Sequence, residues 1–193
     1  SDRVCASVSL QLSQSVAMTR EAFNGTLTLY NGNELTPMRD LKMEVSVLDE
    51  DGNECRDLVV MNNLGTSGAM SSGWIVDGGL SVSAGGTGSA VVQFIPSHNA
   101  APTNEKVYRF GGTVTYTDPF SGEKATVKLT PVALTVSPSP YLKLDYFIQR
   151  DVYADDPMTE QVEASMPAEM AVLVVNTGAG DAKNVTISSV QPE

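Results

Sequence analysis

The chain has 193 residues, of which 41% are hydrophobic and 18% charged, and its formal net charge is -11 at pH 7. This length predicts one or two domains with enough apolar material for a core. An acidic surface repels phosphates, which argues against a nucleic-acid partner, and no apolar run reaches the roughly 18–20 residues that membrane insertion needs. The chain begins at Ser1 without a basic stretch leading into an apolar run, so we expect any signal peptide to have been removed.

Apolar and polar residues alternate with a period of two along most of the chain, as expected of β-strands. The first predicted strands span residues 4–13, 23–30 and 41–48. An Asp-Gly pair in the acidic turn 49–54 predicts a hairpin. A short strand is expected over 55–61 with Leu58 and Val60 facing inward, followed by a loop rich in Gly, Ser and Asn over 62–73.

The next segments complete a first domain over residues 1–136. A weak strand is expected over 74–82 and a stronger one over 90–95, before a polar loop that runs to Lys106. Residues 107–117 and 124–136 form a predicted hairpin around the turn formers of 118–122. The apolar phase of the last strand changes at Pro131, which predicts a bulge or a change of sheet.

The segment Ser137-Pro138-Ser139-Pro140 predicts a stiff linker over 137–140. Beyond it, strands are expected over 142–148, 170–175 and 184–189, with an acidic loop over 151–163. Both halves place an opening strand, a polar loop and a strand that ends at an Asn-Gly type of turn in the same order, which indicates a repeated plan. Three strands rarely bury a sandwich core, so residues 141–193 are interpreted as the truncated start of a second domain.

Two pairs of segments carry a family resemblance. Leu27-Thr28-Leu29-Tyr30-Asn31-Gly32 with residues 41–48, and residues 171–180 with Asn184-Val185-Thr186-Ile187, resemble the second and third strands of CARDB-like and related immunoglobulin-like repeats. Residues 80–85 and 91–96 are similar to the later part of such a module. The resemblance implies an all-β fold, an immunoglobulin-like β-sandwich followed by a second, incomplete immunoglobulin-like unit. It also implies a large bacterial surface or secreted protein and no catalytic residues.

Two cysteines, Cys5 and Cys55, leave the question of a disulfide open. A bridge would close a loop of about 50 residues and stabilise the fold by roughly 4 kcal/mol. The strand parity places both side chains on outer faces, so a bridge requires the two strands to be neighbours in one sheet.

No catalytic arrangement is apparent. The chain has one histidine, His98, in a polar loop, and the Gly-rich segment 85–88 leads into a strand rather than into the helix that a phosphate loop needs. We therefore expect no enzymatic activity and no cofactor.

Two sites are weighed as ligand sites. The acidic loop offers Asp151, Asp155, Asp156 and Glu160 as oxygen ligands for calcium, and a solvated acidic loop is the alternative. Trp74, the one tryptophan, is a candidate sugar contact, and core packing is the alternative.

These observations predict a non-catalytic immunoglobulin-like segment of an extracellular multi-domain bacterial protein, which acts as a spacer or adhesion module. The alternative is a carbohydrate-binding accessory module of a secreted enzyme. The expected partners are other domains of the same chain and a surface glycan or a protein ligand.

Overall fold

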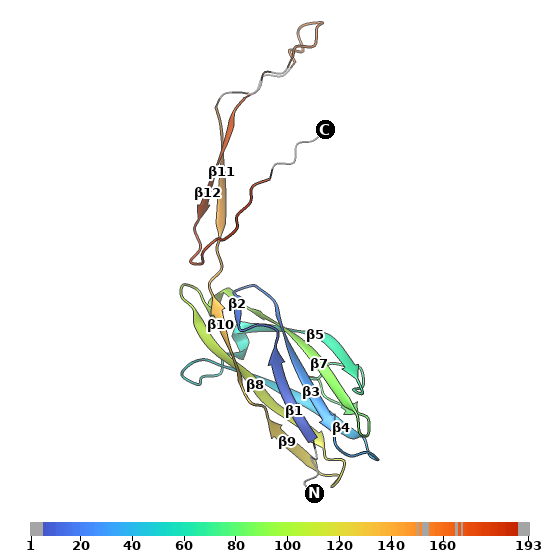
Figure 1. Ribbon diagram of the computed structural model, residues 1–193. Coiled ribbons are helices and arrows are strands. Elements are labelled where there is room, and N and C mark those ends of the chain that lie inside the picture. Colours follow the sequence, from blue (N-terminus) through green and yellow to red (C-terminus); the bar gives the residue numbers. More distant parts are fainter. Residues whose placement is uncertain (1–5, 150, 152–154, 165, 167, 189–193) are drawn as a thin grey trace. The chain divides into compact units, whose positions relative to one another are not determined.

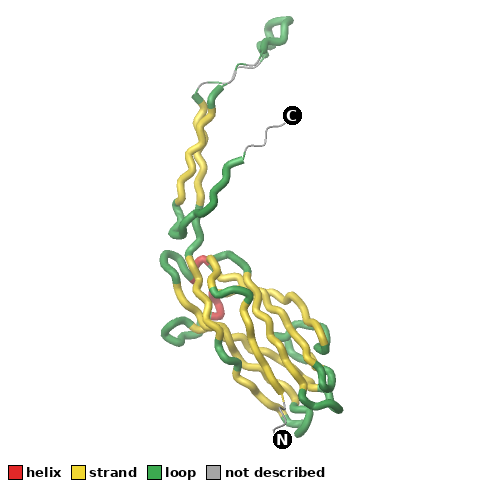
Figure 2. Tube along the Cα trace, viewed as in Figure 1, coloured by secondary structure: helices red, strands yellow, loops and turns green. Residues whose placement is uncertain are grey.

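The computed structural model describes residues 6–149, 151, 155–164, 166 and 168–188. The chain divides into two compact units, Ser1–Ser139 and Pro140–Glu193, called unit 1 and unit 2 below. Unit 1 consists almost entirely of strands and their connecting loops (Figure 2). The fold is therefore all-β, as the sequence predicts.

Unit 1 is a sandwich of two sheets (Figure 1). The first sheet has the strand order β1-β3-β7-β5, with β1 over Ala6–Leu12, β3 over Phe23–Asn31, β7 over Thr87–Pro96 and β5 over Val59–Gly68. The second sheet has the order β2-β10-β8-β4-β6, and β9 also pairs with β8. Its strands are β2 (Val16–Met18), β4 (Met38–Leu48), β6 (Leu80–Val82), β8 (Lys106–Thr117), β9 (Lys124–Lys128) and β10 (Val132–Ser137).

The core lies between the two inner faces, where alternate residues of each strand are buried. In β3, Phe23, Leu27 and Leu29 point inward while the intervening polar residues face solvent, as their alternation predicts. Phe23 and Phe94 of the first sheet meet Phe110 of the second, with ring centroids 5.0–5.5 Å apart. Such aromatic contacts add to the stabilisation from buried apolar area.

The first strand changes sheets partway. β1 pairs antiparallel with β3, whereas β2, four residues later, pairs in parallel with β10 of the opposite sheet. Ala6 lies opposite Asn31 at one end of the sandwich, and Val136 lies opposite Lys106 at the other end. The chain therefore enters unit 1 at one end and leaves it at the other (Figure 1).

The predicted interruption at Pro131 is a bulge. β9 and β10 both pair with β8, and the register moves by one residue between Lys128 opposite Thr113 and Val132 opposite Phe110. The chain does not change sheet there. The bulge lets both Val127 and Leu134 face the core although they have opposite parity.

The predicted hairpin at the acidic turn is wrong. Only a single bridge, Leu48 to Glu54, joins the segments on either side of the turn. A short 3-10 helix over Arg56–Leu58 follows, and β5 then joins the first sheet. This helical turn also changes the phase, so that Val59 is buried and Val60 is 55% exposed, which is the reverse of the predicted inward face.

The expected loop over residues 62–73 is also partly wrong, because β5 continues to Gly68. Its Asn and Gly residues have weak strand propensity, but the ladder with β7 holds them extended. The register shifts between Asn63 and Gly65, where Gly65 has a φ of 96°, so the glycine allows a bulge in this edge strand.

Asn31 is a fully buried polar side chain at the end of β3. Its Nδ2 donates to the carbonyl oxygens of Thr36 at 2.9 Å, Ser83 at 3.2 Å and Val82 at 3.4 Å, and its Oδ1 accepts the N–H of Asn33 at 3.0 Å. The side chain thus joins the end of the first sheet to two loops of the second.

Unit 2 contains β11 (Leu142–Ile148) and β12 (Met170–Asn176), paired antiparallel. Asn176 lies opposite Leu142, as Asn31 lies opposite Ala6 in unit 1. Its Nδ2 donates to the Gly180 carbonyl at 2.7 Å and its Oδ1 accepts the Gly178 N–H at 3.0 Å. The repeated plan therefore extends to strand register and to the asparagine that closes the turn.

One face of β11 and β12 corresponds to the core face of unit 1. Leu144, Tyr146 and Ile148 line this face opposite Val174, Val172 and Met170. Tyr146 is 64% exposed. The expected strand over residues 184–189 is absent over 184–188, because these residues pair with no strand in the described part of the chain; residue 189 lies outside it.

Substitution of Asn31 by alanine tests the buried junction. We expect Asn31→Ala to lower the free energy of unfolding by about 3 kcal/mol, because three carbonyls lose their donor in a site closed to water. Asn62→Ala, which removes an exposed bond to Gln93, should change it by less than about 0.5 kcal/mol. Equal losses in denaturant titrations of the two variants would contradict this role.

Candidate functional site

The acidic turn over residues 49–54 is organised by its own hydrogen bonds. Asp49 Oδ1 accepts the N–H groups of Asn53 at 2.8 Å and Asp51 at 3.0 Å, and Oδ2 accepts from the Asn53 side chain at 3.1 Å. The bonds from Asn53 come first among those that lower the pKa of Asp49. Since this pKa is depressed on folding, its contribution to stability is present above the ordinary aspartate pKa and is lost as the pH falls through the depressed value. Glu54 accepts from Ser46 and from the Val47 N–H.

Cys55 lies beside this turn and is half-buried. Burial raises the pKa of the Cys55 thiol, and the carboxylate of Asp49 raises it further. Cys55 forms no disulfide within the described residues. Cys5 lies outside them, so the Cys5–Cys55 bridge stays a prediction.

Tyr108 is buried on the core side of the acidic turn, where the charge of Asp49 also acts on it. Its hydroxyl donates to the Ala100 carbonyl at 2.5 Å, and burial raises its pKa. The bond ties β8 to the short helix over His98–Ala100, so the loop that contains His98 has a structural anchor.

The acidic loop of unit 2 folds around a residue that the sequence did not single out. Glu163 accepts the Thr159 hydroxyl at 2.5 Å and the Asp156 N–H at 2.9 Å, and the Thr159 bond is the main reason why its pKa is lowered. Asp155 accepts the Glu163 N–H and Asp156 accepts the Met158 N–H.

Within the described residues, no three His, Cys, Asp or Glu side chains converge as a metal site requires. Calcium binding by Asp151, Asp155, Asp156 and Glu160 therefore stays a prediction. To bind the cation, the carboxylates of this loop would have to give up the hydrogen bonds that they accept from backbone N–H groups. Heat in a calorimetric titration with calcium, together with a raised Tm, would support it. The absence of both would contradict it.

Trp74 lies in the connection between β5 and β6. Its side chain is half-buried and packs against the core beside the buried Ile75. The Ile75 carbonyl accepts the N–H of Met43, which anchors this connection to β4. The structure therefore gives Trp74 a packing role, and its contact with a sugar stays a prediction.

Charge is unevenly distributed over unit 1. The four strands of the first sheet contain no Asp, Glu, Lys, Arg or His. The second sheet contains charged residues in β4, β8 and β9, most of them basic. Sequence patterns did not reveal this segregation, because strand pairing alone brings the basic residues together.

Comparison with solved structures finds matches at low identity. The chain is similar to a family 123 glycoside hydrolase from Clostridium perfringens (13% identity, 70% of this chain and 28% of that one, TM-score 0.45). It is also similar to the major pilin SpaD from Corynebacterium diphtheriae (10%, 82% and 39%, 0.46). A cohesin module from a Clostridium perfringens family 33 glycoside hydrolase aligns at 11% identity over 68% of this chain and 98% of that one, with a TM-score of 0.43.

No family model and no curated protein matches the chain, so the resemblance to CARDB-like repeats stays a prediction. The chain spans well under half the length of the hydrolase and the pilin. These identities are all below 25% and these TM-scores all below 0.5, so the similarities carry no argument about the role of the chain.

The electrostatic setting of Cys55 predicts low thiol reactivity. In a Cys5→Ser background, Asp49→Asn should accelerate alkylation at neutral pH by about twofold, because a nearby negative charge no longer opposes the thiolate. Asp77→Asn, at an exposed site outside this turn, should leave the rate unchanged. Equal acceleration in both variants would contradict a local effect of Asp49.

Proposed function

We propose that the chain is a non-catalytic immunoglobulin-like segment of an extracellular multi-domain bacterial protein, acting as a spacer or adhesion module. The observation that carries the proposal is the path of the chain through unit 1. The chain enters at one end and leaves at the other, and the early strand β2 pairs in parallel with the last strand β10.

This arrangement suits a module that transmits force. Tension applied through the two ends pulls β2 and β10 in opposite directions along their length, so the bonds between them are loaded together. The Thr19 N–H donates to the Ser137 carbonyl at 2.9 Å and the Thr135 N–H to the Ser15 carbonyl at 2.9 Å. The Thr19 hydroxyl, which is buried, also accepts the Ser139 N–H at 3.1 Å.

The proposal also draws on the tandem plan of the two units. In the described part of the chain, the apolar face of β11 and β12 is largely exposed, and it matches the face that the second sheet covers in unit 1. Residues 140–193 are therefore interpreted as the opening strands of a further sandwich. Repeated sandwiches in series are a simple way to build an extended surface protein. No helix in the described ranges has the length and apolarity needed to cross a membrane.

Single-molecule pulling on the whole chain tests the load-bearing role. Unit 1 should unfold in one step, and Thr19→Val should lower both its rupture force and its free energy of unfolding, the latter by about 1 kcal/mol. Thr28→Val is the matched control, since the hydroxyl of Thr28 contacts that of Ser89 within the first sheet. Gradual opening at low force, or equal effects of the two substitutions on the rupture force, would contradict the proposal.

A further inference from the structure

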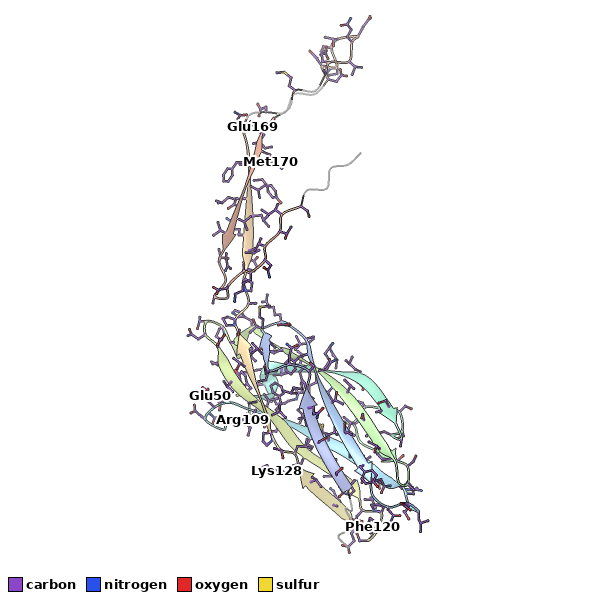
Figure 3. All side chains as sticks on the ribbon, viewed as in Figure 1. Glu50, Arg109, Phe120, Lys128, Glu169 and Met170 are labelled. Carbon is purple, nitrogen blue, oxygen red and sulfur yellow. The ribbon has the colours of Figure 1, made fainter. Side chains whose placement is uncertain are left out.

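The outer face of the second sheet carries positive charge on an acidic protein. Five of the chain's 12 basic residues lie on it, and together they are called the cationic face: Arg39 and Lys42 of β4, Arg109 of β8, and Lys124 and Lys128 of β9. All five side chains are exposed. Figure 3 shows Arg109 and Lys128 along the same side of unit 1.

Strand register arranges these cations around a row of threonines. Thr117 of β8 lies between Arg39 and Lys124, Thr115 lies opposite Lys42, and Thr113 lies opposite Lys128. β4 and β9 flank β8 on opposite sides, so the two rows of cations are about 10 Å apart, and Lys124 and Lys128 are about 13 Å apart along β9. Hydroxyl groups therefore line the middle of the face, four of the cations line its margins, and Arg109 lies further along the central strand β8.

None of the five cations forms an ion pair within the described residues. In the part of the chain that the structure describes, the one ion pair is Lys143–Asp145 of unit 2. Two carboxylates lie on the β4 side of the face, Asp40 and Glu44, and Asp40 already accepts the Thr117 hydroxyl at 2.7 Å. The acidic turn over residues 49–54 follows β4 beyond Arg109, and its Asp49 and Glu54 carboxylates accept N–H donors. Within the strands of this face, five cations therefore stand against two carboxylates. Further acids lie in the adjoining turns, among them Glu123 beside Lys124 and Glu50 beyond Arg109.

We propose that the cationic face binds an anionic polysaccharide. The margins offer cations to carboxylate or sulfate groups, and the threonine row offers hydroxyls that can donate to and accept from sugar hydroxyls. A peptide suits the face less well, because the backbone of β8 is already paired with β4 on one side and with β9 and β10 on the other. A bound peptide would find no strand edge on β8 and would have to pair its backbone with the outer edge of the short strand β9 instead.

The inference deepens the proposed function, on which it rests, by naming the ligand of an adhesion module. The two are separable experimentally, since substitutions on the exposed face leave the β2–β10 pairing and the passage of force through unit 1 intact. Because the protein as a whole is acidic, an anionic polysaccharide should bind only at the cationic face, and added salt should weaken this binding.

Calorimetric titration of the full chain with polygalacturonate, dextran sulfate and neutral dextran tests the proposal. We expect binding to one or both anionic polymers and none to dextran. Polygalacturonate carries carboxylates and dextran sulfate carries sulfates, so comparing the two shows which anionic group the face prefers. Lys124→Gln combined with Lys128→Gln should weaken binding by about tenfold, and 0.5 M salt should weaken it as well.

The matched control is Arg20→Gln combined with Lys106→Gln, which removes the same charge away from the face. Lys106 has the parity of the buried Tyr108, and Arg20 lies in the connection between β2 and β3. Equal weakening by the control would overturn the proposal in favour of a net-charge effect, as would failure of both anionic polymers to bind. Equal affinity for polyglutamate would assign the face to acidic protein partners, and salt-sensitive self-association without polymer would assign it to a second copy of the chain. The rupture force of unit 1 is measured in the Lys124→Gln, Lys128→Gln variant as well. If it equals that of the unmodified chain, a loss of polysaccharide binding reports on the ligand site and not on the spacer role.

Discussion

The contact of Phe23 and Phe94 with Phe110 is the constraint on which unit 1 depends, since it joins the two sheets across the core. Each sheet must present apolar residues inward at every second position to reach this contact, and neither can do so without the other. The inner faces are therefore closely restricted in composition. The outer faces are not, and this freedom allows one sheet to lack charge while the other gathers cations.

The parts of the fold that depend on alternation were predictable from the sequence. The runs in β3 and β7 have a clean period of two, as does β4 beyond an irregularity near Asp40, and the phase change at Pro131 correctly indicated an irregularity between β9 and β10. Predictions failed where pairing overrides local preference. The end of β5 is rich in Asn and Gly but is held by β7, and a helical turn at 56–58 inverted the expected phase at Val59. Residues 184–188 alternate like a strand but have no described strand beside them.

The candidate sites were less predictable, because residue type does not reveal which groups a side chain meets. The acidic segments suggested calcium, yet the carboxylates of Asp49 and Glu163 accept N–H and O–H donors within their own loops. The cationic face was missed for a different reason. Arg39 and Lys128 are far apart in sequence, and only the pairing of β4 and β9 with β8 places them on one surface.

The absence of charge from the first sheet has a cost at its two edges. Exposed edge strands can template the addition of strands from other molecules, and many proteins guard against this with lysine or proline. β1 and β5 have neither, and Val60 and Leu64 are exposed along β5. In β5, the bulge at Gly65 hinders such pairing, because it interrupts the straight run of backbone N–H and C=O groups that a strand from another molecule would follow. Gly65 thus shapes β5 and also opposes aggregation through the exposed edge of this strand.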